Sequence, residues 1–213
     1  VNMLYVRSSL ERANESRREM EAVNVKLLKQ SETDQMTGLA NRYRLNAYSE
    51  KVLDYCYEHR LPLAMEILDI DFFKQYNDNY GHQQGDECII AIANELKKME
   101  DGQTFCARYG GDEFIIIYAG ISAEEVHAKA GALRQNIMNL KLEHLYSKAL
   151  PIVTISQGIS YGVPEEGNRS WDFLHTADML LYQVKKKSRN DICIADIRGQ
   201  ELDLSSKQEK VEP

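Results

Sequence analysis

In the stretch Arg108-Tyr109-Gly110-Gly111-Asp112-Glu113-Phe114, a Gly-Gly pair stands between two short apolar runs. Glycine reaches positive φ without a Cβ clash, so this pattern predicts a β-hairpin with the glycines at its tip. Adjacent side chains in extended backbone point to opposite faces, and we therefore expect different roles for Asp112 and Glu113. Only one of them should join a carboxylate from a neighbouring strand. The alternative is a plain hairpin tip with solvated acids, because a short motif is only a hypothesis.

The length and composition of the chain set its broad class. Its 213 residues and 43% hydrophobic content suffice for one good-sized domain with appendages. The net charge of −7, without a basic stripe, argues against a protein that coats DNA or RNA, although a single nucleotide remains a suitable ligand. The four cysteines are far apart, which indicates a reduced, cytoplasmic protein rather than a disulfide or zinc framework.

The chain contains no apolar run that approaches the roughly 18 residues of a membrane span, so we expect no membrane contact from this segment. We expect a cytoplasmic location, and the cytoplasmic part of a membrane-bound sensor is an alternative. Because the chain begins with Val1, we also expect it to be a fragment with a sensor domain upstream.

Residues 1–33 contain no Gly or Pro and show a seam with alternating spacings of three and four. Six of the nine seam positions are apolar, which predicts an N-terminal helix that forms a parallel coiled-coil linker. A solvated helix with chance spacing is the alternative, since the run covers only about four heptads. We expect the folded domain at 34–196 and a disordered polar tail at 197–213.

A second acidic cluster follows the strand predicted at residues 63–68. Asp69 and Asp71 come at the end of this strand, and a short helix is expected to open directly after them. Carboxylates beside the first amides of a helix suit a metal–phosphate site, because acids bind hard cations and amides bind phosphate oxygens. The alternative is that Asp71 only caps the helix.

Polar residues farther along offer partners for a nucleobase. Asn77 lies in a polar turn, and Asp86 lies near the start of a helix predicted from residue 85 onward. An amide and a carboxylate suit the edge of guanine, which presents both donors and acceptors. The alternatives are a turn-forming Asn77, an Asp86 favoured by the helix dipole, and a structural His82.

Basic residues end the helix predicted at 171–187. Lys185, Lys186, Lys187 and the following Arg189 could reach a polyphosphate, or could only complement the negative end of the helix dipole. The remaining elements are helices predicted at 42–59 and 122–140 and strands predicted at 152–161 and 192–194.

Taken in order, these motifs resemble the GGDEF family of diguanylate cyclases, which condense two GTP into cyclic di-GMP. The resemblance covers about residues 32–196. It implies an α/β, palm-like domain related to class III nucleotide cyclases, with a central, mostly antiparallel sheet flanked by helices. The motifs are Asp34-Gln35-Met36-Thr37-Gly38-Leu39-Ala40-Asn41-Arg42, Asp69-Ile70-Asp71-Phe72-Phe73-Lys74, Asn77-Asp78, Gly81-His82, Gly85-Asp86, the Gly-Gly hairpin, and Ala177-Asp178 with Tyr182, Lys185, Arg189 and Asn190.

The resemblance also implies which residues hold the metal. Asp69, the carbonyl of Ile70, Asp112 and Glu113 would bind Mg²⁺, with Mn²⁺ as an alternative, at two ions per GTP. Asp112, Glu113 and Lys74 are the implied catalytic residues.

The implied substrate contacts fall into two groups. Asn77 and Asp86 would read guanine, with His82 nearby. The triphosphate would be held by the amides of Phe72 and Phe73 together with Lys74, Lys185 and Arg189.

The implied reaction requires two copies of the domain. The 3′-hydroxyl of one GTP attacks the α-phosphorus of another, and pyrophosphate leaves. Because one domain holds one GTP, we expect a two-fold homodimer in which each protomer supplies half the site. The seam in residues 3–31 would raise the local concentration of the partner domain and set its orientation.

The chain departs from the family pattern at a few positions. Asp101 and Thr104 replace the Arg-x-x-Asp of product-inhibited members, so we expect no such inhibitory site. Ser188 replaces the usual glycine before Arg189, which puts the Arg189 contact in doubt. Gln157 stands in a predicted strand where the family has an apolar residue, and the sequence offers no account of it.

Other functions are possible for such a chain. A catalytically silent GTP-binding module is the main alternative, and the intact Asp69, Asp112 and Glu113 argue against it. Asn77 with Asp86 argues against a mononucleotide or mixed-product cyclase. A purely structural coiled-coil module would leave the ordered acids unexplained.

Overall fold

The computed structural model describes residues 14, 15, 17, 18, 20, 27, 32–200 and 202. The chain divides into two compact units, Val1–Thr33 and Asp34–Pro213. Most of the predicted seam in residues 3–31 lies outside the described residues, as do residue 201 and residues 203–213 of the predicted tail. The described helices do not include one long and apolar enough to cross a membrane.

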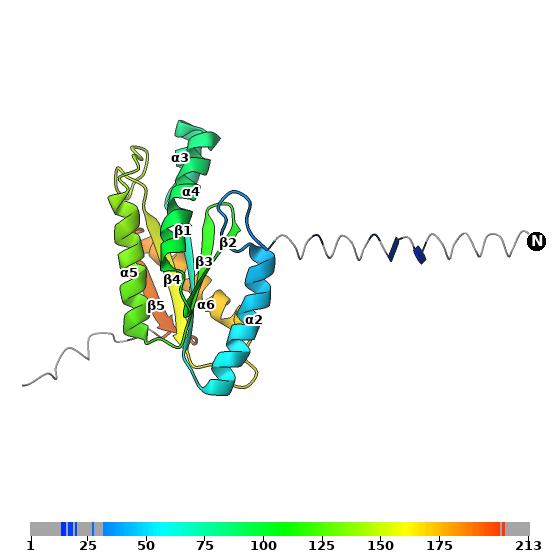
Figure 1. Ribbon diagram of the computed structural model, residues 1–213. Helices are drawn as coiled ribbons and strands as arrows, with labels where there is room; N and C mark the ends of the chain where they lie inside the picture. Colours follow the sequence, from blue (N-terminus) through cyan, green and yellow to red (C-terminus); the bar gives the residue numbers. More distant parts are fainter. Residues whose placement is uncertain are drawn as a thin grey trace, which may run out of the picture. The chain divides into compact units, whose positions relative to one another are not determined.

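The second unit is built on a five-stranded sheet with the order β2-β3-β1-β4-β5 (Figure 1). β1 pairs antiparallel with both β3 and β4, and β2 pairs antiparallel with β3, whereas β4 and β5 are parallel. The predicted central, mostly antiparallel sheet is therefore confirmed. The strands are β1 (Leu63–Ile70), β2 (Thr104–Gly110), β3 (Glu113–Ala119), β4 (Ile155–Gly162) and β5 (Ile192–Asp196).

Helices cover both faces of this sheet and enclose two apolar cores (Figure 1). Successive side chains of β1 alternate between the cores, as they must in a strand. Met65 and Ile67 face α2 and α6, whereas Ala64 and Leu68 face α3, α4 and α5. The helices are α2 (Arg42–His59), α3 (Phe73–Tyr80), α4 (His82–Met99), α5 (Ala123–Asn139) and α6 (Ser170–Lys187).

The contact between α6 and β4 depends on a glycine. A Cβ added at Gly158 would lie 2.2 Å from the carbonyl oxygen of Ala177 and 2.3 Å from the amide nitrogen of Leu181. Both obstacles are backbone atoms of α6, which cannot rotate away. The absence of a side chain at Gly158 therefore allows α6 to pack directly on the sheet and brings its C-terminal turn near the end of β1.

The structure also accounts for Gln157, which the sequence left unexplained. Gln157 is buried on the α4–α5 side of the sheet and donates to Glu66 Oε1 over 2.7 Å. Tyr118 donates its hydroxyl to Glu66 Oε2 over 2.8 Å. Burial raises the pKa of Glu66 to about 7, and the two hydrogen bonds oppose this rise. Gln157 is thus the partner of a buried carboxyl group.

Ordered structure continues past residue 196, where we predicted the folded domain to end. Ile197 accepts a hydrogen bond from the Thr176 hydroxyl over 2.9 Å. The amide of Gln200 donates to Asp196 Oδ1 over 2.9 Å and its carbonyl accepts from the amide of Asp196 over 2.8 Å. Residues 197–200 therefore form a hydrogen-bonded turn against the domain.

Candidate active site

The two acidic clusters meet at one end of the sheet. In the pairing of β1 with β3, Asp69 stands directly opposite Glu113. Opposed residues of an antiparallel pair point to the same face with their Cβ atoms roughly 5 Å apart. Asp112 precedes Glu113 on the turn, where Gly111 has φ +54°. The hairpin predicted from the Gly-Gly pair thus carries its acids to the end of β1.

Arg108 fixes the tip of this hairpin. Its Nη2 and Nε donate to the carbonyl of Gly111 over 2.8 and 3.2 Å. Its Nη1 lies 3.2 Å from Asp34 Oδ1, in the turn that precedes α2. Asp34 also accepts from the amide and the hydroxyl of Thr37. This ion pair links the first turn of the domain to the acidic hairpin, and neither turn alone predicts it.

The acids at this edge repel one another and attract cations. Burial raises the pKa of Asp69 to about 6, Lys185 opposes the rise, and the charges of Asp112 and Glu113 add to it. The pKa of Glu113 is raised mainly by burial, with Asp112 and Asp178 contributing. Lys185 Nζ forms an ion pair with Asp69 Oδ2 at 2.8 Å. A carboxylate cluster of this kind favours a bound cation. The positive charge offsets both the free-energy cost of burying the carboxylates and the repulsion between them.

The donor set suits a hard divalent ion. The described residues contain no group of three or more His, Cys, Asp or Glu side chains that could hold a metal ion by themselves. An ion at Asp69 and Glu113 therefore needs further oxygen ligands from backbone carbonyls, phosphates and water. Mg²⁺ characteristically binds through one or two carboxylates together with substrate phosphates, so these residues fit it.

The turn between β1 and α3 does not place Asp71 at the start of the helix, as a capping role would require. The residue that precedes α3 is Phe72, which has φ +56° and makes no side-chain cap. Asp71 is fully buried and accepts hydrogen bonds from Thr154 and Ser156 instead, so the interpretation of Asp71 as a helix cap is wrong. The amides of Phe72 and Phe73 stand at the start of α3, where the helix dipole favours anions.

The predicted phosphate-binding cations lie at this same edge. Arg189 Nη1 is 3.5 Å from Asp71 Oδ1, and its guanidinium lies 4.3 Å from the centre of the Phe72 ring. Lys74 is exposed on the first turn of α3. Ser188 has φ −136°, so the position where the family has glycine does not need one here. The turn that carries Arg189 thus forms without the glycine.

The predicted guanine-binding residues lie on α3 and α4. Asn77 Oδ1 is buried without a protein hydrogen-bond partner. Asn77 packs against Gly85, where an added Cβ would stand 1.8 Å from Oδ1. Exposed His82 and Asp86 are four residues apart on α4 and share one face. An unpaired acceptor beside an exposed carboxylate offers the chemistry that guanine N1–H and N2–H require.

His144 is a site residue that sequence reasoning missed. It is fully buried, and its Nε2 donates to the carbonyl of Phe72 over 3.1 Å. Burial lowers the pKa of His144, which favours the neutral ring. Because His144 lies 72 positions from Phe72 in the chain, only the fold brings them together. His144 therefore supports the turn at the start of α3.

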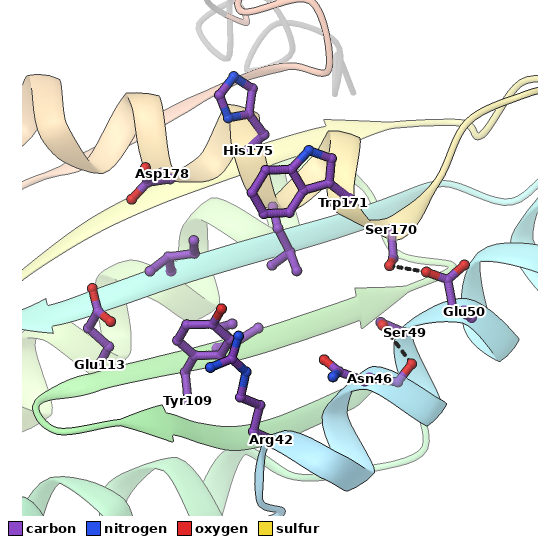
Figure 2. Close-up of a pocket in the computed structure, with 13 residues that line it drawn as sticks. Arg42, Asn46, Ser49, Glu50, Tyr109, Glu113, Ser170, Trp171, His175 and Asp178 are labelled. Carbon is purple, nitrogen blue, oxygen red and sulfur yellow. Dashed lines mark hydrogen bonds between the residues drawn. The ribbon is translucent and has the colours of Figure 1, made fainter.

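A cavity of about 570 Å³ extends from Glu113 between α2, α6 and the sheet. Figure 2 shows Glu113 and Asp178 at one end of this cavity and the hydrogen bond from Ser170 to Glu50 toward the other. The guanidinium of Arg42 lies 4.5 Å from the centre of the Tyr109 ring. The sequence did not predict this cavity, because its walls come from five elements that are separate in the chain.

Comparison with known proteins identifies the fold and the motifs together. The family model described as "Diguanylate cyclase, GGDEF domain" matches residues 31–191, which is more than half of the chain. The chain belongs to the GGDEF family. The Gly-Gly hairpin, the Asp69 strand end and the five-stranded sheet are therefore features of a GGDEF domain, and the resemblance drawn from the motifs is confirmed.

Curated relatives of this GGDEF domain carry the name diguanylate cyclase. The chain is 35% identical over 163 residues to the probable diguanylate cyclase DgcC of Escherichia coli K12, covering 75% of this chain and 42% of the relative. It is 33% identical over 190 residues to the diguanylate cyclase DgcP of Pseudomonas aeruginosa, covering 87% of this chain and 28% of the relative. The chain thus spans less than half the length of these relatives.

Solved GGDEF domains have the same fold. The coiled coil and GGDEF domain of DgcB from Caulobacter crescentus, solved in complex with c-di-GMP, gives a TM-score of 0.71 at 28% identity and covers 86% of this chain and 97% of that one. The active GGEEF domain of a diguanylate cyclase from Vibrio cholerae gives a TM-score of 0.62 at 30% identity, covering 73% and 97%.

Proposed function

We propose that this GGDEF domain is a diguanylate cyclase that condenses two GTP into cyclic di-GMP and two pyrophosphates. The observation that carries the proposal is the register of β1 and β3, which sets Asp69 opposite Glu113 with Asp112 on the adjoining turn. The names of the curated relatives support the same activity. The buried, cation-favouring acids support metal-dependent phosphoryl transfer over a purely structural module.

The proposed metal ligands are Asp69, the Ile70 carbonyl, Asp112 and Glu113, with Mg²⁺ or Mn²⁺ at two ions per GTP. When bound, such ions lower the pKa of the attacking 3′-hydroxyl and neutralise charge on the phosphates. Lys185 neutralises Asp69 at 2.8 Å and is close enough to the acids to contact a phosphate held between them.

The remaining groups bind and orient the nucleotide. Asn77 Oδ1, which has no protein partner, accepts from guanine, and Asp86 accepts a second donor with His82 on the same face. The groups proposed to hold the triphosphate are the amides of Phe72 and Phe73, the ammonium groups of Lys74 and Lys185, and the guanidinium of Arg189. The position of the Arg189 guanidinium over the Phe72 ring, next to the start of α3, supports this proposal.

Two such domains must face each other for the reaction. Each holds one GTP, so the 3′-hydroxyl of one nucleotide meets the α-phosphorus of the other across a two-fold axis. The neighbour DgcB was solved with a coiled coil beside its GGDEF domain. By analogy, residues 1–33 form the coiled coil that pairs two copies here and couples them to a sensor domain upstream.

We also propose that the enzyme lacks the product-inhibition site at Asp101 and Thr104. Lys129 Nζ lies 2.8 Å from Asp101 Oδ2 and 2.9 Å from the Thr104 hydroxyl. Both side chains thus contact the same lysine, Lys129, within the domain, and neither position offers an arginine to a phosphate. Addition of cyclic di-GMP should accordingly leave the rate unchanged.

The assignment of the site is tested by the variant Asp112→Ala. We expect cyclic di-GMP formation from GTP and Mg²⁺ to fall by at least about a hundredfold, because a charge-stabilising catalytic group is removed. Far-ultraviolet circular dichroism and the unfolding midpoint should stay unchanged, since Asp112 lies half-buried on the hairpin turn and not in either apolar core. Unaltered turnover in a folded variant would remove Asp112 from the site. Wild-type protein that binds GTP without turnover at any protein concentration would point to the silent module.

A further inference from the structure

Asp71 joins three separate parts of the chain at the phosphate-binding edge. It follows β1 and is fully buried. Its Oδ2 accepts from the Thr154 hydroxyl over 2.8 Å and from the Asn190 amide over 2.9 Å. Its Oδ1 accepts from the Ser156 hydroxyl over 2.7 Å and lies 3.5 Å from Arg189 Nη1. A buried carboxylate is tolerated only when it is paired in this way.

The two turns beside Asp71 have unfavourable backbone conformations. Phe72, the residue next to Asp71, has φ +56°. Arg189 and Asn190, which Asp71 contacts, have φ +53° and +45°. Residues other than glycine adopt such a conformation at a cost in free energy, which is smaller for Asn, and they persist there only where their surroundings fix them. Asp71 adjoins Phe72 in the chain and contacts both Arg189 and Asn190, so it connects all three positions.

Asp71 and Phe72 hold the Arg189 guanidinium from two sides. The carboxylate lies 3.5 Å from Nη1, and the Phe72 ring lies 4.3 Å from the guanidinium carbon. A long arginine side chain that is free in solution loses rotamer entropy when it binds a phosphate. Holding the guanidinium in advance removes part of that cost from the binding step.

We propose that Asp71 is a positioning residue for the triphosphate. It aligns the Phe72 turn with the Arg189–Asn190 turn, so that the amides at the start of α3 and the guanidinium face the same phosphate group. This inference rests on the proposed function, because it assumes that GTP binds at this edge. It assigns Asp71 a role in affinity for the phosphates that goes beyond the stability of the sheet.

The test compares Asp71→Asn with Glu66→Gln. Both variants turn a fully buried carboxyl group of the β1 region into an amide. Within residues 32–200, the Glu66 carboxyl group accepts hydrogen bonds only from Tyr118 and Gln157, on the opposite face of the sheet from Asp71. Binding is measured by calorimetry with Mg²⁺ and 3′-deoxy-GTP, which cannot cyclise, and with guanosine, which has no phosphates. Unfolding in urea is measured for each variant alongside.

We expect Asp71→Asn to weaken 3′-deoxy-GTP binding about tenfold and to leave guanosine binding unchanged, because the lost contacts to Arg189 are charge-assisted. Glu66→Gln should alter neither affinity. Ser156→Ala is a milder change that removes one hydrogen-bond donor to Asp71. It should weaken 3′-deoxy-GTP binding by a smaller factor, again without affecting guanosine. If Asp71→Asn does not fold, Ser156→Ala provides the test. In the double variant Asp71→Asn/Arg189→Ala, the loss should not exceed that of Arg189→Ala alone by more than about twofold.

Equal losses for 3′-deoxy-GTP and guanosine, or full affinity for both in folded Asp71→Asn and Ser156→Ala, would overturn the inference. Those outcomes leave the proposed function intact as long as the wild type makes cyclic di-GMP. Failure of the wild type to bind 3′-deoxy-GTP would instead overturn the proposed function, and the inference with it.

Discussion

Glu66 and Asp71 show how two buried carboxyl groups of one strand region take opposite roles. In the described part of the domain, Glu66 accepts hydrogen bonds only from the neutral side chains of Tyr118 and Gln157, so burial dominates and its pKa rises to about 7. Asp71 accepts hydrogen bonds from two hydroxyls and a backbone amide, and it forms an ion pair with the guanidinium of Arg189. These contacts connect Asp71 to β4 and to the turn that carries Arg189 and Asn190. The number and charge of the donors therefore separate a core residue from one at the site.

The raised pKa of Glu66 predicts a pH-dependent stability. Because the pKa rises from 4.5 to about 7 on folding, the native state holds a proton that the unfolded state lacks between these values. The contribution of Glu66 is complete below pH 4.5 and is lost as the pH rises through about 7. The loss amounts to at most about 1.4 kcal/mol per pH unit.

The measurement is urea unfolding of wild type and Glu66→Gln between about pH 5 and pH 8. The variant does not titrate at this position, so its stability relative to wild type should rise up to about pH 7 and then level off. A difference that stays constant over the whole range would contradict the raised pKa. Taking the difference removes the titration of groups common to both proteins.

Among the elements, α6 depends most directly on one residue of the sheet. Gly158→Ala would set a Cβ 2.2 Å from the Ala177 carbonyl oxygen, so α6 must move away from β4. We expect the free energy of unfolding to fall by about 3 kcal/mol or more, the upper range for overpacked cores. Cyclic di-GMP formation should also fall, because the same shift displaces Lys185 from Asp69.

The matched control is Gly131→Ala within α5. A Cβ there would meet no atom within 4 Å, so the gain in helix propensity should raise stability by up to about 1 kcal/mol. Urea unfolding of both variants makes the comparison. Equal and small changes in the two variants would show that α6 does not pack as closely on β4 as described.

Local patterns predicted the elements well, and the reason is physical. The Gly-Gly pair at 110–111 and the β-rich runs beside it determine the hairpin, since the turn geometry depends on residues adjacent in the chain. The strand predicted at 152–161 begins instead at Ile155 and ends at Gly162. Its start depends on pairing with β1, which is a tertiary contact that local propensity does not encode.

For the whole molecule, the resemblance of the motifs to the GGDEF family predicted the mostly antiparallel sheet and the meeting of the two acidic clusters. It did not predict which groups surround them. The donors to Asp71 lie 83, 85 and 119 positions away in the chain. Residues so far apart become neighbours only through the strand order, so no spacing rule finds them.

The proposed reaction requires two domains to meet, because two GTP molecules are joined and each domain holds one of them. Where monomers dominate, the rate of cyclic di-GMP formation should then rise with the square of the protein concentration, because each productive encounter needs two protomers. Replacing residues 1–31 by a strong parallel coiled coil should raise the rate at low protein concentration without changing the product.

The most direct measurement incubates the purified protein with GTP and Mg²⁺ at several protein concentrations and separates the products by chromatography. We expect cyclic di-GMP with two pyrophosphates per molecule, at a rate that rises faster than linearly with protein concentration. A rate strictly proportional to protein over a range in which it is monomeric, or Mg²⁺-dependent GTP binding without cyclic di-GMP even in the coiled-coil fusion, would contradict it.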